Sequence, residues 1–97
     1  RSETGSVDDK NGKSNKINTS FSVPQLAIFT RLQIEEKIFS NEKTKTLRAV
    51  AAMYSTPFAK DISFGSLKQH FYTFDTGTKE AVRCRLIDML RHLNQGI

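Results

Sequence analysis

The clearest pattern of hydrophobic and polar positions lies in the last third of the chain. Ile62-Ser63-Phe64 alternates as a short strand does, and residues 64–74 then place apolar side chains at helical spacing. Asp75-Thr76-Gly77 follows with residues typical of a tight turn, in which glycine can adopt a positive φ. We therefore predict a short strand, a helix and a turn. The inward-facing residues of this helix are Leu67, Phe71 and Phe74.

A longer helix is predicted to run from Thr78, which can cap it, to Gly96, a typical stop. Its apolar residues recur every three or four positions and gather on one side, which we expect to face the core. This expected core face consists of Val82, Leu86, Met89, Leu90, Leu93 and Ile97. A helix, a turn and a longer helix, preceded by a short strand, form the order of elements in a helix-turn-helix domain of the winged-helix class.

Residues 40–54 predict another helix, with Leu47, Val50 and Ala51 at helical spacing. Ser40 or Asn41 can cap its first free amides. Proline at position 57 ends it, because the residue before a proline is pushed out of helical geometry.

Residues 21–39 are apolar and interrupted by Pro24. Ser22 can cap a helix that has Pro24 inside its first turn, but an extended start at residues 21–23 is equally compatible. Before them, residues 1–20 are rich in Ser, Lys, Asn and Asp and bury too little apolar surface to fold. We predict a disordered linker over residues 1–20 and one domain over residues 21–97.

Composition narrows the possible functions only a little. No apolar run approaches the ~20 residues of a membrane helix, and no signal peptide opens the chain. The formal net charge is +5, but the basic residues are spread along the sequence. This charge permits DNA binding without requiring it, because dedicated DNA-binding domains usually carry a denser basic face.

Catalysis and metal binding have little support in the sequence. His70 and His92 lie on different predicted helices, and the single Cys84 has no evident His or Asp partner at helical spacing. Glu35-Glu36 is best explained as a solvated helix face, and no glycine-rich phosphate loop occurs. We therefore expect no enzyme activity, no cofactor, no metal and no small-molecule substrate.

An interaction module is the first functional hypothesis. Residues 21–39 hold more apolar side chains than a three-helix core can take up, and an exposed apolar patch on a small domain usually marks an interface. On the last helix, Cys84 and Ile87 widen the apolar part beyond what such packing needs. The predicted interface residues are Phe21, Val23, Leu26, Ile28, Phe29, Cys84 and Ile87.

DNA binding is the alternative hypothesis. Basic side chains on the outer side of the last helix suit contacts to phosphates or bases, whereas Asp88 in the middle of that side would meet the phosphate field. A second basic group on the helix predicted over residues 40–54 could anchor phosphates. The residues of this alternative are Lys43, Lys45, Arg48, Arg85, Arg91 and His92.

The end of the chain also resembles a known family. The Ile-x-Phe strand, the aromatic cluster HFYTF at residues 70–74, the glycine turn and RLIDMLRHLNQGI at residues 85–97 are similar to the C-terminal winged-helix domain of the origin-recognition and replication-loader ATPases. Members of this family include the yeast heterochromatin silencing paralogue, a silent information regulator. The resemblance covers about residues 31–97 and consists of patterns of residue class.

The resemblance implies a mostly α, winged-helix-like helix-turn-helix domain of three to four helices with a minimal or absent wing. The chain stops at residues 96–97, where a β-hairpin wing should begin, and the outer side of the last helix is mixed in charge. Both departures favour the protein-binding use of the domain within this family over DNA reading. The resemblance therefore implies a nuclear, chromatin-associated module that pairs with itself or with another chromatin protein. None of the ATPase motifs occur, so no nucleotide activity is implied.

Overall fold

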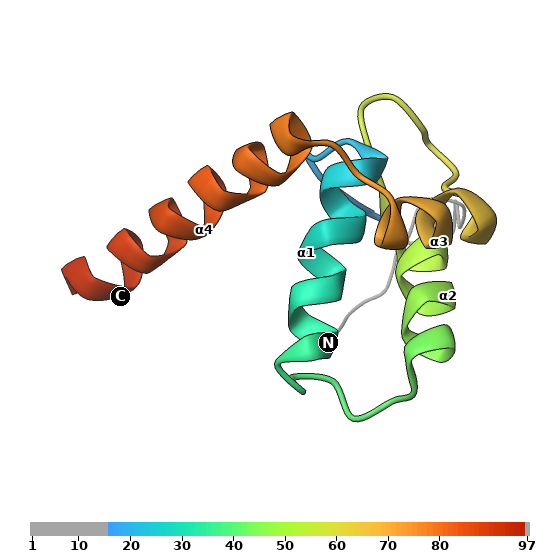
Figure 1. The fold of residues 1–97 in the computed structure, drawn as a ribbon, viewed down its shortest axis with the longest axis horizontal. Helices are drawn as coiled ribbons and strands as arrows, with labels where there is room; N and C mark the ends of the chain where they lie inside the picture. The colour runs from blue at the N-terminus through green and yellow to red at the C-terminus, as the bar shows by residue number, and fades with distance from the viewer. Residues whose placement is uncertain (1–15, 97) are drawn as a thin grey trace, which may run out of the picture.

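The computed structural model describes residues 16–96, which are mostly helical. Figure 1 shows α1 in the middle of the molecule, with α2 and α3 to one side and α4 extending away on the other. The only strands among the described residues are a short parallel pair. In chain order the elements are β2 (Ile17–Asn18), α1 (Val23–Glu35), α2 (Lys43–Met53), β3 (Tyr54–Ser55), α3 (Phe64–Tyr72) and α4 (Thr76–Gly96).

Helix α1 begins at the local signal that the sequence carries. Ser22 is the N-cap, and its hydroxyl accepts a hydrogen bond from the Gln25 amide at 3.3 Å. The Gln25 side chain in turn accepts from the Ser22 amide at 3.0 Å, which completes a capping box with Pro24 inside the first turn. The predicted helical start is confirmed, and the extended alternative is wrong.

The hydrophobic core lies where α1, α2 and α3 meet. Leu67 and Phe71 of α3 are buried as predicted, and so are Leu47, Val50 and Ala51 of α2. Aromatic and aliphatic side chains that are only partly buried pack around this centre. The core cluster consists of Leu26, Ala27, Leu47, Val50, Ala51, Ile62, Leu67 and Phe71.

Three predicted local features are wrong. The expected strand at residues 62–64 is absent, because Ser63 caps α3 instead and accepts a hydrogen bond from the Ser66 amide at 3.0 Å. The expected turn at residues 75–77 is also absent, since α4 begins at Thr76 and the Asp75 carboxylate accepts from the Thr78 amide at 2.7 Å. The predicted caps Ser40 and Asn41 lie before α2, whose N-cap Glu42 makes no side-chain cap bond.

The predicted linker begins to fold before its expected end. Residues 1–15 lie outside the described residues, but Ile17–Asn18 pairs with Tyr54–Ser55. The Thr19 amide and hydroxyl both donate to the Ser55 carbonyl, at 2.9 and 3.0 Å. Lys16 forms an ion pair with Asp61 at 3.0 Å. The domain boundary therefore lies at or before residue 16.

Helix α4 departs most from expectation. Of its expected core face only Val82 is buried, while Leu86 is half-buried and Met89, Leu90 and Leu93 are exposed. Ile97 lies outside the described residues. The helix ends as predicted at Gly96, whose φ is 122°. None of the helices within residues 16–96 is long and apolar enough to cross a membrane.

Candidate interaction surface

The part of α4 beyond its contact with α1 carries a row of apolar side chains on the surface. We call Leu86, Met89, Leu90 and Leu93 the α4 apolar face. Met89, Leu90 and Leu93 are 52%, 57% and 60% exposed. Single exposed apolar side chains are common, but this row is contiguous because residues three and four apart are neighbours on a helix. Ile87 is also exposed and lies further round the helix.

Helix length explains why this face stays uncovered. The 21 residues of α4 span about 31 Å at 1.5 Å per residue, whereas the 13 residues of α1 span only about 20 Å. Figure 1 shows α4 leaving α1 at an angle, so that its C-terminal end extends away from the other helices. Burial of α4 side chains therefore ends near Leu86, and beyond this point α4 only borders a cleft with Phe21 and Phe29.

A cleft of about 310 Å³ lies on one side of the contact between α1 and α4. Phe74, which was predicted to face inward, is 36% exposed and forms part of its wall. The charged residues at the rim are Arg31, Glu35, Lys79 and Arg83. The apolar residues that line it are Ile28, Leu32, Phe74, Val82 and Leu86.

A second cleft, of about 540 Å³, lies on the other side of this contact. Its apolar wall combines Met89 with Phe21 and Phe29, whose rings lie 5.3 Å apart. Arg85 reaches across its edge and donates a hydrogen bond to the Ser20 hydroxyl at 3.1 Å. The remaining polar residues of its lining are Asp88, Arg91, His92 and Gln95.

The charged residues beside the α4 apolar face are basic. Arg83 and Arg85 precede Leu86 by three residues and one residue and lie on the two flanks of the face, and His92 lies on the same flank as Arg85. The two carboxylates of α4, Glu80 and Asp88, point away from the face by helical geometry. Glu80 forms an ion pair with Arg83 at 3.1 Å.

The interface predicted from the sequence is partly wrong. Leu26 and Ile28 are buried in the monomer at 3% and 5% exposure, so neither is available to a partner. The core takes up more of the apolar residues of α1 than expected, because α1 contacts all three other helices. The other five predicted residues are half-buried or exposed: Phe21, Val23, Phe29, Cys84 and Ile87.

The residues of the DNA-binding alternative fall into two separate groups. Lys43, Lys45 and Arg48 lie on α2, and the other three, Arg85, Arg91 and His92, lie on α4. Figure 1 shows these two helices on opposite sides of α1. The fold therefore does not unite the predicted phosphate anchors and the predicted recognition helix in one surface.

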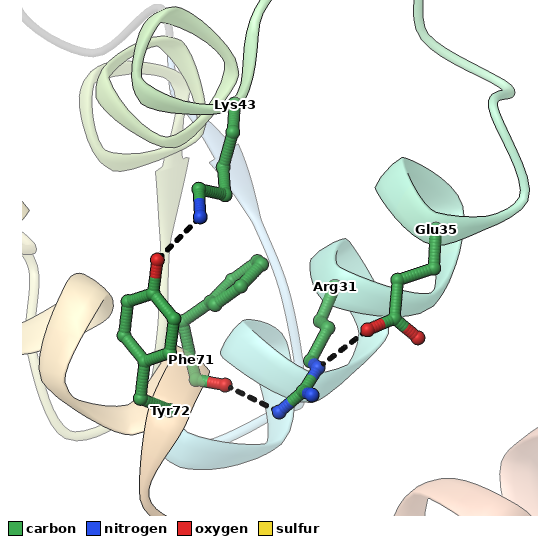
Figure 2. A network of polar contacts seen from close by, with 5 residues as sticks. All are labelled: Arg31, Glu35, Lys43, Phe71 and Tyr72. Carbon is green, nitrogen blue, oxygen red and sulfur yellow. Dashed lines mark hydrogen bonds and ion pairs between the residues drawn. The ribbon is translucent and has the colours of Figure 1, made fainter.

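A cluster of cations and aromatic rings joins α2 to α3 (Figure 2). The Lys43 ammonium donates a hydrogen bond to the Tyr72 hydroxyl and holds the pKa of that phenol below its ordinary value of 10.0. Arg48 stacks over the Phe64 ring with its guanidinium carbon 4.2 Å from the ring centre, and Lys68 lies 5.9 Å from the same centre. Such contacts hold each cation against the protein surface.

Arg31 connects this cluster to α1, as Figure 2 shows. Its guanidinium donates to the Glu35 carboxylate at 2.9 Å and to the Phe71 carbonyl at 3.0 Å. The Phe71 carbonyl belongs to the last turn of α3, where carbonyls lack helical partners. A cation there also suits the negative end of the helix dipole. Arg31 therefore has a structural role between α1 and α3.

Within residues 16–96 no group of three or more His, Cys, Asp or Glu side chains is placed to hold a metal ion. His70 lies on α3 and His92 on α4, and Cys84 is exposed. Comparison of the chain with protein-family models, curated proteins and solved structures finds no match.

The sequence contained a signal for the exposed face that periodicity alone does not give. The apolar residues of α4 have the spacing of a core face, and this spacing is the same whether a face is covered by the protein itself or by a partner. The predicted partner helices were shorter than the last helix. This difference in length indicates that part of the apolar face lies beyond the reach of the neighbouring helices.

Proposed function

We propose that this domain is a non-catalytic protein-interaction module that binds through the α4 apolar face. The observation that carries the proposal is the exposure of Met89, Leu90 and Leu93 in an unbroken row on a helix that extends from the domain. Contiguous exposed apolar surface on a small domain typically marks a site for another protein. A helix that offers anchors three and four residues apart suits helix-to-helix docking.

The winged-helix class and a chromatin setting remain part of this proposal. The short α3, three connecting residues and the longer α4 follow the order of a helix-turn-helix, which supports the class. The resemblance to the winged-helix domain of origin-recognition ATPases favours a nuclear role in a gene-silencing or origin-type complex. A second copy of the chain is then the first partner to test.

The free energies gained and lost on association predict that self-association is weak. In a symmetric pair, four half-exposed Leu and Met side chains become buried on each copy, and each stabilises the complex by roughly 1 kcal/mol, about half the value for full burial. Loss of translational and rotational freedom on association opposes this by about 4 kcal/mol or more. Contacts in the two clefts must therefore contribute further stabilisation to that of the apolar face. We expect a dissociation constant between about 1 µM and 1 mM.

Sedimentation equilibrium over a wide concentration range tests the proposal on the full 97-residue chain. We expect a reversible dimer that Met89→Gln weakens by roughly ten-fold or more, because a symmetric pair loses the apolar contact twice. Glutamine is a good helix former, so α4 itself should persist. The matched control is Met53→Gln on α2, since Met53 is also 52% exposed.

Two outcomes contradict self-association through the α4 apolar face. One is a mass that stays monomeric at the highest concentration. The other is an equal effect of Met89→Gln and Met53→Gln on the dimer, which moves the interface away from α4.

A further inference from the structure

The spacing of apolar residues on α4 matches that of a two-helix seam. Val82, Leu86, Met89 and Leu93 are separated by four, three and four residues, the alternation that keeps one side of a helix against another helix. Val82 is already buried by the domain, and exposure increases toward Leu93. A partner helix would therefore continue the seam from Leu86 outward.

The flanks of this seam determine which partner fits. One flank holds Arg85 and His92, and the other holds Arg83 and Leu90. The two carboxylates of α4 lie outside both flanks, and the nearer of them, Glu80, is bound to Arg83. The two flanks therefore carry no carboxylate, and their charged or titratable side chains are all basic.

A second copy of the chain does not complement these flanks. In an antiparallel pair of α4 helices, equivalent flanks meet, so Arg85 would face the partner's His92 with no carboxylate between them. In a parallel pair, the Arg85 flank would meet the partner's Arg83 and the partner's Leu90. Neither arrangement forms an ion pair along the seam, and like charges that face each other oppose association.

Each cleft has more basic than acidic residues in its lining, with one carboxylate apiece: Glu35, which is paired with Arg31, and Asp88. Lys79 stands at the rim of the cleft lined by Leu32 and Leu86, and Arg91 belongs to the cleft lined by Met89. Neither basic residue has a carboxylate partner in the part of the chain that the structure describes. By helical geometry Arg91 projects from the side of α4 opposite the seam, so of these two residues only Lys79 would meet a ligand helix seated there.

We propose that the preferred occupant of the α4 apolar face is an amphipathic helix of another protein whose apolar stripe is bordered by glutamate or aspartate. This inference rests on the proposed interaction function and names the chemistry of its partner. Because the apolar contacts only roughly offset the loss of translational and rotational freedom, charges at the flanks decide which helix binds.

Two synthetic peptides test this preference. Both have leucine at the two seam positions of each heptad, and their flanking positions carry glutamate in one peptide and lysine in the other. Repulsion between like flanks keeps each peptide from pairing with itself. Fluorescence anisotropy with the full 97-residue chain then measures binding to each labelled peptide at low and at high salt.

We expect the glutamate peptide to bind at least ten-fold more tightly than the lysine peptide and to weaken as salt rises. Arg85→Gln should reduce this preference while leaving the stripe intact. Met89→Gln should reduce binding of the glutamate peptide, and the control Met53→Gln should not. Any dimer that forms in sedimentation should instead be favoured by salt, because salt screens its basic flanks.

Equal binding of the two peptides, lost in Met89→Gln, would overturn the inference and leave the interaction function standing. Self-association tighter than glutamate-peptide binding would overturn it too, because a second copy would then be the preferred occupant. Absence of peptide binding together with a strictly monomeric mass would overturn both proposals.

Discussion

At the residue scale, Tyr72 shows how a neighbour changes the chemistry of a surface side chain. The hydrogen bond from Lys43 is the largest cause of its lowered pKa, and the positive charge of the same ammonium adds to the effect. We predict that Lys43→Met raises the pKa of Tyr72 toward 10.0. Ultraviolet titration of tyrosinate in a Tyr54→Phe background isolates this phenol.

The effect of pH on the stability of Lys43→Met provides a control. A phenol with a depressed folded-state pKa contributes stability that is fully present above its unfolded pKa and is lost as pH falls through its folded-state pKa. Near neutral pH this contribution is absent, so the midpoint of thermal unfolding should change much less than at alkaline pH. An unchanged titration midpoint in Lys43→Met would show that the hydrogen bond does not persist in solution.

At the element scale, Asp75 holds the first turn of α4. Its carboxylate accepts hydrogen bonds from the hydroxyl and the amide of Thr78, which hold the pKa of Asp75 below its ordinary value of 3.8. Because the folded-state pKa is depressed, the stabilisation is present above the unfolded pKa and is lost as pH falls through the folded pKa.

We therefore predict that Asp75→Ala lowers the thermal midpoint at neutral pH and that the difference from the unaltered chain disappears in acid. Asp75→Asn is the matched control, because asparagine also caps helices but does not titrate in this range. Thermal unfolding followed by circular dichroism from neutral to strongly acidic pH measures both. A difference between Asp75→Ala and the parent that is independent of pH would contradict an ionised cap.

The accuracy of the sequence-based predictions depended on how local each signal was. The start of α1 was predictable because Ser22, Pro24 and Gln25 carry the whole cap within four residues. The pairing of residues 17–18 with residues 54–55 was not predictable, because its partners lie far apart in the sequence. Residues 62–64 alternate like a strand, but Ser63 forms a helix cap that competes with that pattern.

The prediction of the candidate site was limited in the same way. Helical spacing identified the apolar side of α4 correctly, but spacing carries no information about what covers that side. The surplus of apolar side chains in residues 21–39 assigned Leu26 and Ile28 to an interface, although both are buried. Coverage depends on where neighbouring helices end, which is a property of the tertiary structure.

At the scale of the whole molecule, the domain divides into a packed body and an extension. The body buries its largest apolar side chains between α1, α2 and α3, whereas α4 contacts the body mainly through α1. Native domains are stable by about 0.05–0.15 kcal/mol per residue, or roughly 4–12 kcal/mol for residues 16–96. A single substitution that opens a cavity in the body can therefore remove much of the free energy of unfolding, whereas the exposed end of α4 contributes little to it.

Two Leu→Ala substitutions, one in the body and one near the end of α4, test this division. Leu67→Ala removes a side chain with 0% exposure and should lower the free energy of unfolding by about 2–5 kcal/mol, whereas Leu93→Ala alters a side chain that is 60% exposed and should change it by less than about 0.5 kcal/mol. Urea unfolding at low protein concentration measures both. A large effect of Leu93→Ala there would mean that the isolated chain covers its own α4 apolar face, which would leave no site for a partner. If Leu93→Ala lowers the free energy of unfolding only at high protein concentration, a second copy of the chain covers the face, because association adds to stability by mass action.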